Sequence, residues 1–388
     1  MIPYGKQDIS QQDIDAVVDV LKSDFLTQGP MVPAFEESIT KYTGADYALA
    51  VNSATSALHV ACLALEIGAG DVVWTSPITF VASANCALYC GAEIDFVDID
   101  PSTFNMCPKL LETKLQKTKS EGKKLPKVVI PVHMCGQPCD MPQIRKLADE
   151  YGFKLIEDAS HAIGGSCEGH KIGSCEYSDV TVFSFHPVKI ITTAEGGVAV
   201  TNDKSVASKM ALYRSHGITR DPSLMTKVSD GPWYYEQLCL GFNYRMTELQ
   251  AALGLSQMQR LDDFVSVRHQ LAVRYDELLD DLPIVTPYRD SRHYSAFHLY
   301  VIRLKLDFIK STHLEIFCGL KEKGIGVNLH YIPVHLHPYY LALGFQEGDF
   351  PIAESYYKTA ISIPLYFGLT HEEQDLVVNT LSQLLGSD

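Results

Sequence analysis

Between residues 46 and 201 the chain alternates short β-rich runs with stretches of helical periodicity. The strand candidates are YALAV, VVW, IDFV, KVVIPV, KLIE, VTVFSF and GVAV. Between them, residues 54–65, 110–117 and 141–151 are expected to form helices, the last with apolar residues at helical spacing. Strands that alternate with helices are joined by crossover connections, so the chain is expected to be an α/β protein. The pattern predicts a mostly parallel, seven-stranded sheet with helices on both faces.

The pattern changes after about residue 255. A long helix is expected over 255–278, followed by a mixed α/β region that ends in a helix over 372–385. With 388 residues the chain is too long for one small core. We therefore predict an N-terminal arm and large domain over 1–254 and a smaller C-terminal α/β domain over 255–388. The small domain is expected to recruit the arm and its helix over 11–21.

Composition narrows the classes of function. The formal net charge of −15 argues against a protein that binds nucleic acid or an anionic membrane, because such polymers and surfaces would be repelled. The segment MIPYGKQDIS lacks the features of a signal peptide, and apolar runs fall short of the roughly 18 to 20 residues that span a bilayer. The ten cysteines contain no CxxC pair, which favours free thiols. We expect a cytoplasmic protein.

A lysine follows one of the predicted strands in the segment VFSFHPVKIITTAEGGVAV. This lysine, Lys189, lies between the apolar residues Val188 and Ile190, so its amine is expected to be partly desolvated. Desolvation lowers the pKa of an amine and favours the neutral nucleophile that forms an imine with a carbonyl group. The alternative for this segment alone is a surface lysine in a loop.

An acidic residue stands at the end of another predicted strand, in the segment KLIEDASHAIGG. The carboxylate of Asp158 would lie at the carboxyl edge of the sheet, where ligands of open α/β sheets bind. There it could pair with a pyridine nitrogen and keep that nitrogen protonated. The alternative is a helix N-cap.

An anion site is predicted where the segment AVNSATSALHVACLAL passes from strand to helix. The helix N-terminus would direct backbone N–H groups and the positive end of the helix dipole at a phosphate. Small polar residues at this turn could instead merely cap the helix. Phe80 follows a further strand and is a candidate to stack on a planar ring, although an aromatic at a strand end is more often part of the core.

Five motifs in this order resemble the DegT/DnrJ/EryC1/StrS family of sugar aminotransferases: NSATSAL, SPITFVASAN, EDASHA, SFHPVK with EGG, and GFNYRMTELQAALG. The resemblance spans nearly the whole chain. It implies the fold of type I pyridoxal 5'-phosphate (PLP)-dependent transferases. It also implies a homodimer whose active sites are shared between subunits, with L-glutamate as amino donor and 2-oxoglutarate as its product.

The resemblance assigns cofactor roles residue by residue. Lys189 matches the lysine that binds PLP as a Schiff base, and Asp158 matches the partner of the pyridine nitrogen. These two are the expected catalytic residues. His161 matches a position beside the ring hydroxyl of the cofactor, and Asn243 would reach the phosphate from the other subunit. The remaining matches to cofactor-binding positions are Ala54, Thr55, Phe80 and Ser184.

The resemblance also implies residues that bind the sugar nucleotide. The matching positions are Tyr4, Asp24, Phe25, Leu26, Thr27, His330 and Tyr331, with Ala54, Ser184 and Asn243 shared with the cofactor. The pair His330 and Tyr331 could equally be packing residues of the small domain. Arg245 is a candidate clamp for a carboxylate or phosphate, or else part of an ion pair at a dimer interface.

Within the family, several segments are most similar to the branch that serves pseudaminic acid biosynthesis: DFLTQGP, CALYCGA, IEDASHA and SFHPVKIITTAEGG. This implies transfer of an amino group to C4 of a UDP-linked 4-keto-6-deoxy-N-acetyl-hexosamine. The alternative acceptor is another UDP- or dTDP-linked 4-keto-6-deoxy sugar. A PLP-dependent sugar dehydratase is less favoured, because dehydratases of this family carry His in place of the Schiff-base lysine. A non-catalytic regulator would be expected to lose Lys189 or Asp158.

One position departs from the family pattern. Ala194 stands where many members have glycine, immediately before Glu195. Because glycine would permit a positive φ angle, alanine here predicts an ordinary backbone conformation.

Overall fold

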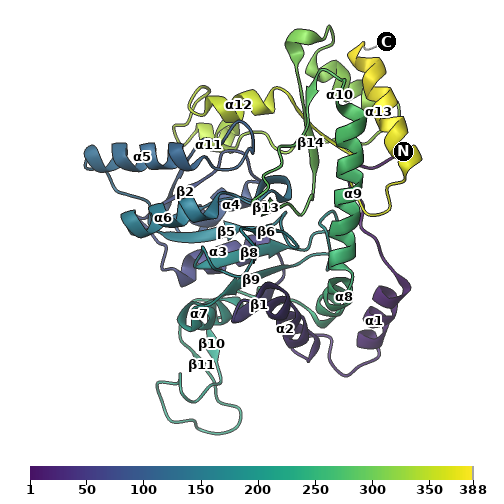
Figure 1. The fold of residues 1–388 in the computed structure, drawn as a ribbon. Coiled ribbons are helices and arrows are strands. Elements are labelled where there is room, and N and C mark those ends of the chain that lie inside the picture. Colours follow the sequence, from purple (N-terminus) through teal and green to yellow (C-terminus); the bar gives the residue numbers. More distant parts are fainter. Residues whose placement is uncertain (387–388) are drawn as a thin grey trace.

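The computed structural model describes residues 1–386 (Figure 1). All seven predicted strands are present and form one sheet in the order β1-β9-β8-β5-β4-β2-β3. This confirms the predicted α/β class and the seven-stranded sheet. The strands are β1 (Tyr47–Val51), β2 (Val72–Thr75), β3 (Glu93–Phe96), β4 (Val128–Ile130), β5 (Lys154–Asp158), β8 (Val180–Ser184) and β9 (Gly197–Thr201).

Strand direction in this sheet decides where the functional loops meet. The pairs β2/β3, β2/β4, β4/β5 and β5/β8 are parallel, whereas β9 runs antiparallel to both of its neighbours, β1 and β8. Strands β1 and β8 therefore run in the same direction. As a result, the carboxyl ends of β1, β2, β5 and β8 lie at one edge of the sheet, the edge at which open α/β sheets bind ligands.

Helices cover both faces of the sheet, as the sequence predicted. One face packs against α3 (Ala54–Ala64), α4 (Ala82–Tyr89) and α7 (Lys204–Arg214). The other packs against α2 (Met31–Thr43), α5 (Pro108–Ser120), α6 (Met141–Tyr151) and α8 (Glu248–Met258). Within β4, Val128 and Ile130 belong to the first core and Val129 to the second. This alternation is what a strand buried on both faces requires.

The long helix expected over 255–278 is in fact two helices, so this prediction was wrong. Helix α8 ends at Met258 and α9 (Leu261–Leu279) begins three residues later, because Arg260 has non-helical backbone angles (φ −110°, ψ 6°). The Arg260 guanidinium donates to the carboxylates of Asp8 and Asp13. These contacts tie the break to the N-terminal arm, whose helix α1 (Gln11–Leu21) packs against α8.

The C-terminal part contains a three-stranded antiparallel sheet of β12 (Ile284–Val285), β14 (Tyr300–Leu304) and β15 (Ala360–Ile363). It shares a core with α9, α10 (His313–Glu322) and α13 (His371–Leu385). The arm joins this core through Ile2, which forms a bridge with Ile325. Two short helices, α11 (Pro338–Leu341) and α12 (Pro351–Tyr357), precede β15. The domain division at residues 254 and 255 stays a prediction.

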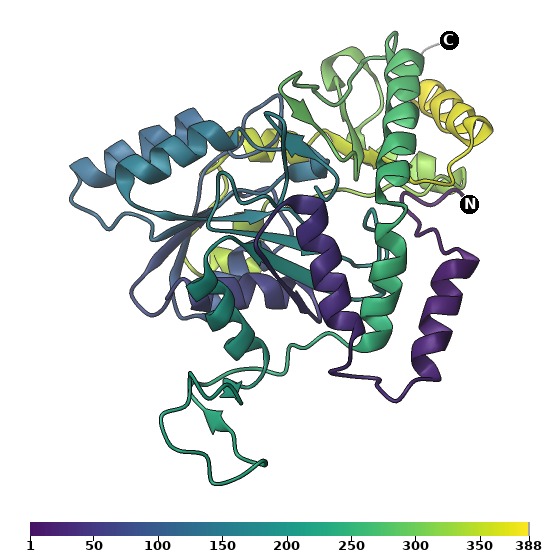
Figure 2. The ribbon, with the colours of Figure 1, turned by 60° about the horizontal axis from the view of Figure 1, so that its bottom comes forward.

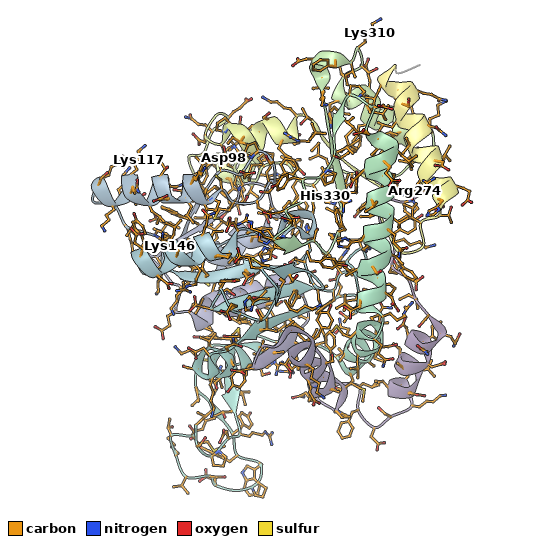
Figure 3. All side chains as sticks on the ribbon, in the orientation of Figure 1. Asp98, Lys117, Lys146, Arg274, Lys310 and His330 are labelled. Atoms are coloured by element: carbon orange, nitrogen blue, oxygen red, sulfur yellow. The ribbon has the colours of Figure 1, made fainter. Side chains whose placement is uncertain are left out.

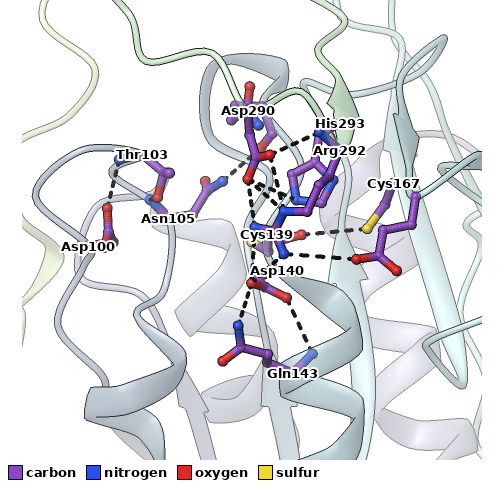
Figure 4. A network of polar contacts seen from close by, with 12 residues as sticks. Asp100, Thr103, Asn105, Cys139, Asp140, Gln143, Cys167, Asp290, Arg292 and His293 are labelled. Carbon is purple, nitrogen blue, oxygen red and sulfur yellow. Dashed lines mark hydrogen bonds and ion pairs between the residues drawn. The ribbon is translucent and has the colours of Figure 1, made fainter.

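A network of ion pairs links the C-terminal part of the chain to the start of α6 (Figure 4). Arg292 precedes β13 (His293–Tyr294), which pairs with β6 (Ser166–Cys167), and β6 pairs in turn with β7 (His170–Lys171). The Arg292 guanidinium lies 2.6 Å from the Asp290 carboxylate and 3.3 Å from that of Asp140. Because Asp140 also caps α6, this arginine connects the start of β13 to the large sheet layer.

A hairpin of β10 (Ile218–Thr219) and β11 (Glu236–Gln237) projects from the body of the chain in both views (Figures 1 and 2). Its connecting loop exposes large apolar side chains, including Val228 and Trp233, and Leu240 is exposed just beyond it. The hairpin thus presents apolar surface away from the core of its own chain.

The structure bears on two predictions from composition, one about membrane-spanning segments and one about the cysteines. No helix within residues 1–386 is both long enough and apolar enough to cross a bilayer. None of the ten cysteines, all of which lie in that range, forms a disulfide. The free thiols agree with the interpretation of the cysteine spacing.

Candidate active site

A cleft of about 500 Å³ lies at the carboxyl edge of the large sheet. It is closed on the opposite side by residues 328–331 and by the N-terminal arm. His330 lies in the interior of the molecule, whereas Lys117, Lys146 and Lys310 point outward (Figure 3). The cleft brings together ten of the predicted site residues, namely Tyr4, Ala54, Thr55, Phe80, Asp158, His161, Ser184, Lys189, His330 and Tyr331.

The other predicted site residues lie outside the cleft of the single chain. Residues 24–27, which are Asp24, Phe25, Leu26 and Thr27, are exposed in the loop after α1. Asn243 is also exposed and bridges Ser215 through its backbone. Arg245 pairs with Val51 at the end of β1 and does not line the cleft. Their proposed roles stay predictions.

Asp158 ends β5 and is held by hydroxyl groups on both sides of its carboxylate. Ser83 Oγ donates to Oδ2 at 2.5 Å, while the backbone N–H and Oγ of Ser160 donate to Oδ1 at 3.1 and 2.6 Å. The residue is 5% exposed. These three hydrogen bonds fix the plane of the nearly buried carboxylate. Such a carboxylate is suited to hold a protonated ring nitrogen.

The donors to Asp158 were not found from the sequence. Ser83 and Thr79 are four residues apart, and their hydroxyl oxygens are separated by 2.7 Å. Since Ser83 gives its single proton to Asp158, Thr79 must be the donor to Ser83. The i,i+4 spacing of two hydroxyl residues at the start of a helix was a visible signal, but nothing in the sequence places that turn beside Asp158.

The predicted anion site lies at the N-terminus of α3. Ser53 caps the helix by accepting the Ser56 N–H, and its carbonyl accepts from Ala57. The first-turn amides of Ala54 and Thr55 have no acceptor within a helix, so they are available to a phosphate. The cap interpretation is confirmed for Ser53, and the anion site stays a prediction that is compatible with it, because Ala54 and Thr55 line the cleft.

Glycine at position 197 permits this turn to approach β9. A Cβ atom added to Gly197 would lie 2.5 Å from the Ala54 nitrogen and 2.6 Å from the Ser53 carbonyl carbon. Both are backbone atoms of the anion-binding turn, so they could not move aside without reshaping it. Any side chain at this position would thus disturb the phosphate site.

We expect Gly197→Ala to weaken PLP binding about 5- to 150-fold, because overpacking against backbone costs about 1 to 3 kcal/mol. The measurement is the Kd for PLP, from equilibrium dialysis with cofactor-stripped protein. Gly68→Ala is the matched control, since a Cβ there meets nothing within 4 Å. Equal affinities for the two variants would contradict the assignment of the phosphate site.

Lys189 lies in the loop between β8 and β9, with its side chain lining the cleft. Burial lowers the pKa of its ammonium to about 8, and the nearby Asp158 and Cys135 partly oppose this change. The lysine is therefore neutral far more often than a lysine in water near pH 7 to 8. The structure supports the desolvated amine that the apolar flanks predicted.

Four histidines line the cleft, and three of them, His161, His298 and His330, are buried and neutral near pH 7. Burial, and after it the nearby Lys189, lowers the pKa of His161 well below its usual range. Burial and Lys189 lower the pKa of His330 to about 3, and the pKa of His298 is also well below normal, mainly through burial. Of these four groups, only Lys189 changes its charge near neutral pH.

This electrostatic arrangement predicts a pH profile for the lysine in the cofactor-free protein. Because the lowered pKa is about 8, the neutral fraction of Lys189 should rise about tenfold per pH unit below pH 8 and level off above it. The measurement is the rate of acetylation at Lys189 by dilute acetic anhydride, followed by peptide mass mapping. A rate that still climbs from pH 9 to pH 10 would contradict the lowered pKa.

The expectation of an ordinary backbone at Ala194 was wrong. Ala194 has φ of 65°, in the left-handed region. Its N–H donates to Thr192 Oγ1 at 2.9 Å, and Thr192 in turn donates to the Phe185 carbonyl. This local hydrogen bonding stabilises a conformation that alanine disfavours by about 1 to 2 kcal/mol.

The cleft provides a complement for each part of PLP. The first-turn amides of α3 and the Ser184 hydroxyl can bind the phosphate, and Asp158 can hold the ring nitrogen. Lys189 provides a neutral amine for the aldehyde carbon. The three groups lie in one cleft whose volume of about 500 Å³ leaves room for a substrate. These residues fit the cofactor.

Comparisons with known proteins identify the family of this chain. Residues 7–382 match the model of the DegT/DnrJ/EryC1/StrS aminotransferase family. The chain is 39% identical over 393 residues to the spore coat polysaccharide biosynthesis protein SpsC of Bacillus subtilis, covering 100% of this chain and 98% of the relative. It is 38% identical over 386 residues to the UDP-4-amino-4,6-dideoxy-N-acetyl-beta-L-altrosamine transaminase of Campylobacter jejuni, covering 99% and 98%.

Solved structures show the same fold. The chain aligns with PseC of Helicobacter pylori, an aminotransferase of pseudaminic acid biosynthesis, with a TM-score of 0.91, 30% identity and full coverage of both chains. A putative sugar aminotransferase of Streptococcus pneumoniae, Spr1654, solved in its PLP form, aligns with a TM-score of 0.88 and 29% identity, covering 99% of this chain and 98% of that one. The chain belongs to the DegT/DnrJ/EryC1/StrS aminotransferase family and is a PLP-dependent nucleotide-sugar aminotransferase.

Proposed function

We propose that the enzyme transfers the amino group of L-glutamate to C4 of UDP-2-acetamido-2,6-dideoxy-β-L-arabino-hex-4-ulose, a UDP-linked 4-keto-6-deoxy sugar, in pseudaminic acid biosynthesis. The observation that carries this proposal is full-length similarity, at 38% identity, to a transaminase named for the product of that reaction. The fold match to PseC, a pseudaminic acid enzyme, supports the same choice. In the donor half of the reaction, glutamate gives up its amino group and leaves as 2-oxoglutarate; in the other half, the amino group replaces the keto oxygen of the sugar.

Asp158 and Lys189 would have different roles in the reaction, and the environment of each side chain explains its role. When bound, PLP supplies an electron-withdrawing ring that stabilises negative charge on the carbon next to the amino nitrogen. Asp158 would hold the proton on the ring nitrogen and so maintain that withdrawal. The Lys189 amine would move the proton at that carbon, and its pKa of about 8 matches this task near neutral pH. The three buried histidines, His161, His298 and His330, are neutral and do not compete for the proton.

A different sugar nucleotide is the main alternative. SpsC, a spore coat polysaccharide protein, is as similar to this chain as the altrosamine transaminase is. A UDP- or dTDP-linked 4-keto-6-deoxy sugar of other stereochemistry would use the same cofactor residues. A dehydratase is disfavoured, because Lys189 occupies the lysine position at which family dehydratases carry histidine.

A panel of acceptors separates these possibilities. Purified protein is incubated with glutamate and a set of UDP- and dTDP-linked 4-keto-6-deoxy sugars, and conversion is followed by mass spectrometry. We expect the UDP-linked N-acetyl sugar of the β-L-arabino configuration to be aminated fastest. Turnover of dTDP-linked sugars alone would overturn the choice of substrate, whereas loss of water without amination would indicate a dehydratase.

We further propose that the enzyme is a homodimer in which each subunit completes the active site of the other. We also propose that it acts in the reducing cytoplasm. Asn243 and residues 24–27 are exposed and lie outside the cleft of their own chain. The projecting hairpin exposes 71% of Trp233 and 91% of Val228, which is apolar surface that a second copy could bury.

Mixing two impaired variants tests the shared site. We expect Lys189→Ala and Asn243→Asp to be impaired separately, since the new carboxylate of the second would repel the phosphate. If Asn243 acts in the partner's site, a mixed dimer contains one intact site, and mixing the unfolded variants and refolding them should restore activity to about a quarter of wild type. Activity no higher than the average of the two separate variants would contradict the shared site.

A further inference from the structure

A residue with a left-handed backbone lies next to the imidazole of His161. Cys135, in the short turn after β4, has φ of 61° and ψ of 3°. Its N–H donates to His161 Nδ1 at 3.3 Å, and its carbonyl accepts from the Leu299 N–H at 3.3 Å. A residue with a side chain rarely adopts this conformation, and doing so costs of order 1 kcal/mol. The surrounding contacts hold the N–H of Cys135 toward the imidazole despite that cost.

This contact determines which nitrogen of His161 carries the proton. The imidazole is neutral, because burial and the charge of Lys189 lower its pKa. A neutral imidazole has one N–H group and one acceptor nitrogen. Since Nδ1 accepts from the Cys135 backbone, the proton lies on Nε2. The opposite tautomer would place two N–H groups against each other.

The protonated Nε2 of His161 in turn sets the hydrogen-bond direction at Tyr331. His161 Nε2 and Tyr331 Oη are 3.1 Å apart, so Nε2–H donates to the phenol oxygen. Burial raises the pKa of Tyr331 above its usual value, and the phenol therefore keeps its proton. Within residues 1–386 the Tyr331 hydroxyl has no other hydrogen-bond partner, and the side chain lines the cleft. Its O–H is left to donate to whatever the cleft binds.

We propose that Cys135 is a positioning residue whose left-handed backbone fixes the tautomer of His161 and thereby makes the Tyr331 hydroxyl a hydrogen-bond donor to a ligand oxygen. The ligand group is an oxygen that accepts, such as the ionised ring oxygen of PLP or the carbonyl oxygen of the keto sugar. The inference rests on the aminotransferase site and does not depend on which sugar is the acceptor.

The conformation of Cys135 suggests a pair of substitutions with opposite expectations. Glycine adopts a positive φ without strain, so Cys135→Gly removes the thiol and keeps the backbone. Valine is β-branched and resists this conformation, so Cys135→Val keeps apolar volume and disfavours the backbone. A role for the backbone therefore predicts that glycine is tolerated and valine is not, whereas a role for the thiol predicts that both are impaired.

The first measurement is nitrogen-15 NMR of protein labelled at histidine, which distinguishes protonated from unprotonated imidazole nitrogens. The His161 signals are assigned by their loss in His161→Gln. We expect wild type and Cys135→Gly to carry the proton on Nε2. Cys135→Val should show the other tautomer or a mixture, with kcat lowered about fivefold and KM changed less than twofold, the effect of one weakened hydrogen bond. A proton on Nδ1 in the wild-type enzyme overturns the proposal, whatever the variants do.

The second measurement finds the acceptor of the Tyr331 proton and uses Tyr331→Phe. If the acceptor is the ring oxygen of PLP, the Kd of the stripped protein for PLP alone should rise about fivefold. If it is the keto oxygen of the sugar, that Kd is unchanged and kcat falls with the sugar as substrate. Should neither quantity change, Tyr331 is not a donor to the ligand. The tautomer of His161 and the Kd for PLP can be measured without any sugar. If every sugar in the acceptor panel failed as a substrate, the proposed function would fail, but the proposal for Cys135 could still be tested.

Discussion

Replacing Lys189 with alanine is expected to lower turnover by about 10⁴-fold or more. Under the proposed roles of Lys189, the substitution removes both the amine that binds the cofactor covalently and the base that moves the proton. A desolvated amine with a pKa of about 8 is suited to both tasks, and no other amine lines the cleft among residues 1–386. Borohydride reduction of the enzyme with bound PLP, followed by peptide mapping, should find the cofactor on Lys189 in wild type and on no peptide of the variant.

The control for this experiment is Lys146→Ala. Lys146 is an exposed residue of α6 that points outward, far from the cleft (Figure 3). We expect its removal to leave both turnover and labelling unchanged. If Lys189→Ala retained turnover and a covalently bound cofactor, the assignment of Lys189 would be wrong.

The second large effect is expected for Asp158→Asn. The amide oxygen can still accept from Ser160, and the amide NH2 group can donate to Ser83 once that hydroxyl turns toward Thr79, so the fold and some cofactor affinity should remain. It carries no charge to keep the ring nitrogen protonated, and we expect kcat to fall about 10² to 10³-fold, as it does when one preorganised electrostatic contact is lost. Steady-state kinetics and the Kd for PLP separate these two effects.

Asp203→Asn is the matched change outside the cleft. Asp203 follows the end of β9 and caps α7, and asparagine is an equally good N-cap. Its kinetics should equal those of wild type. Near wild-type kcat in Asp158→Asn would show that the ring nitrogen does not depend on this carboxylate.

Some features of the fold and site could be predicted because their signals are local. The seven strands were recognised from short β-rich runs, and helices α3, α5 and α6 from helical periodicity. The meeting of Lys189 and Asp158 in one cleft could be predicted, because Asp158 ends one strand, Lys189 follows another, and strands of a parallel sheet end at a common edge. The break between α8 and α9 was missed, because Arg260 departs from helical geometry where its side chain meets Asp8 and Asp13, more than 240 residues earlier.

Hydrogen-bond partners within the site were missed for the same reason. Ser83 is 75 residues from Asp158, and Tyr331 is 170 residues from His161. No periodicity relates such residues. Backbone conformation was equally hidden, since neither Cys135 nor Ala194 is a residue type that favours a positive φ.

The sequence by itself determined the class of chemistry: a lysine, an acidic residue and a helix N-terminus placed after parallel strands, in an order shared with sugar aminotransferases. Only the tertiary structure decided the state of these groups. Burial lowers the pKa of Lys189, three donors orient Asp158, and one backbone N–H selects the tautomer of His161. The physical reason is that charge and proton position depend on the surrounding dielectric and on contacts made across the fold, neither of which a local pattern of residues specifies.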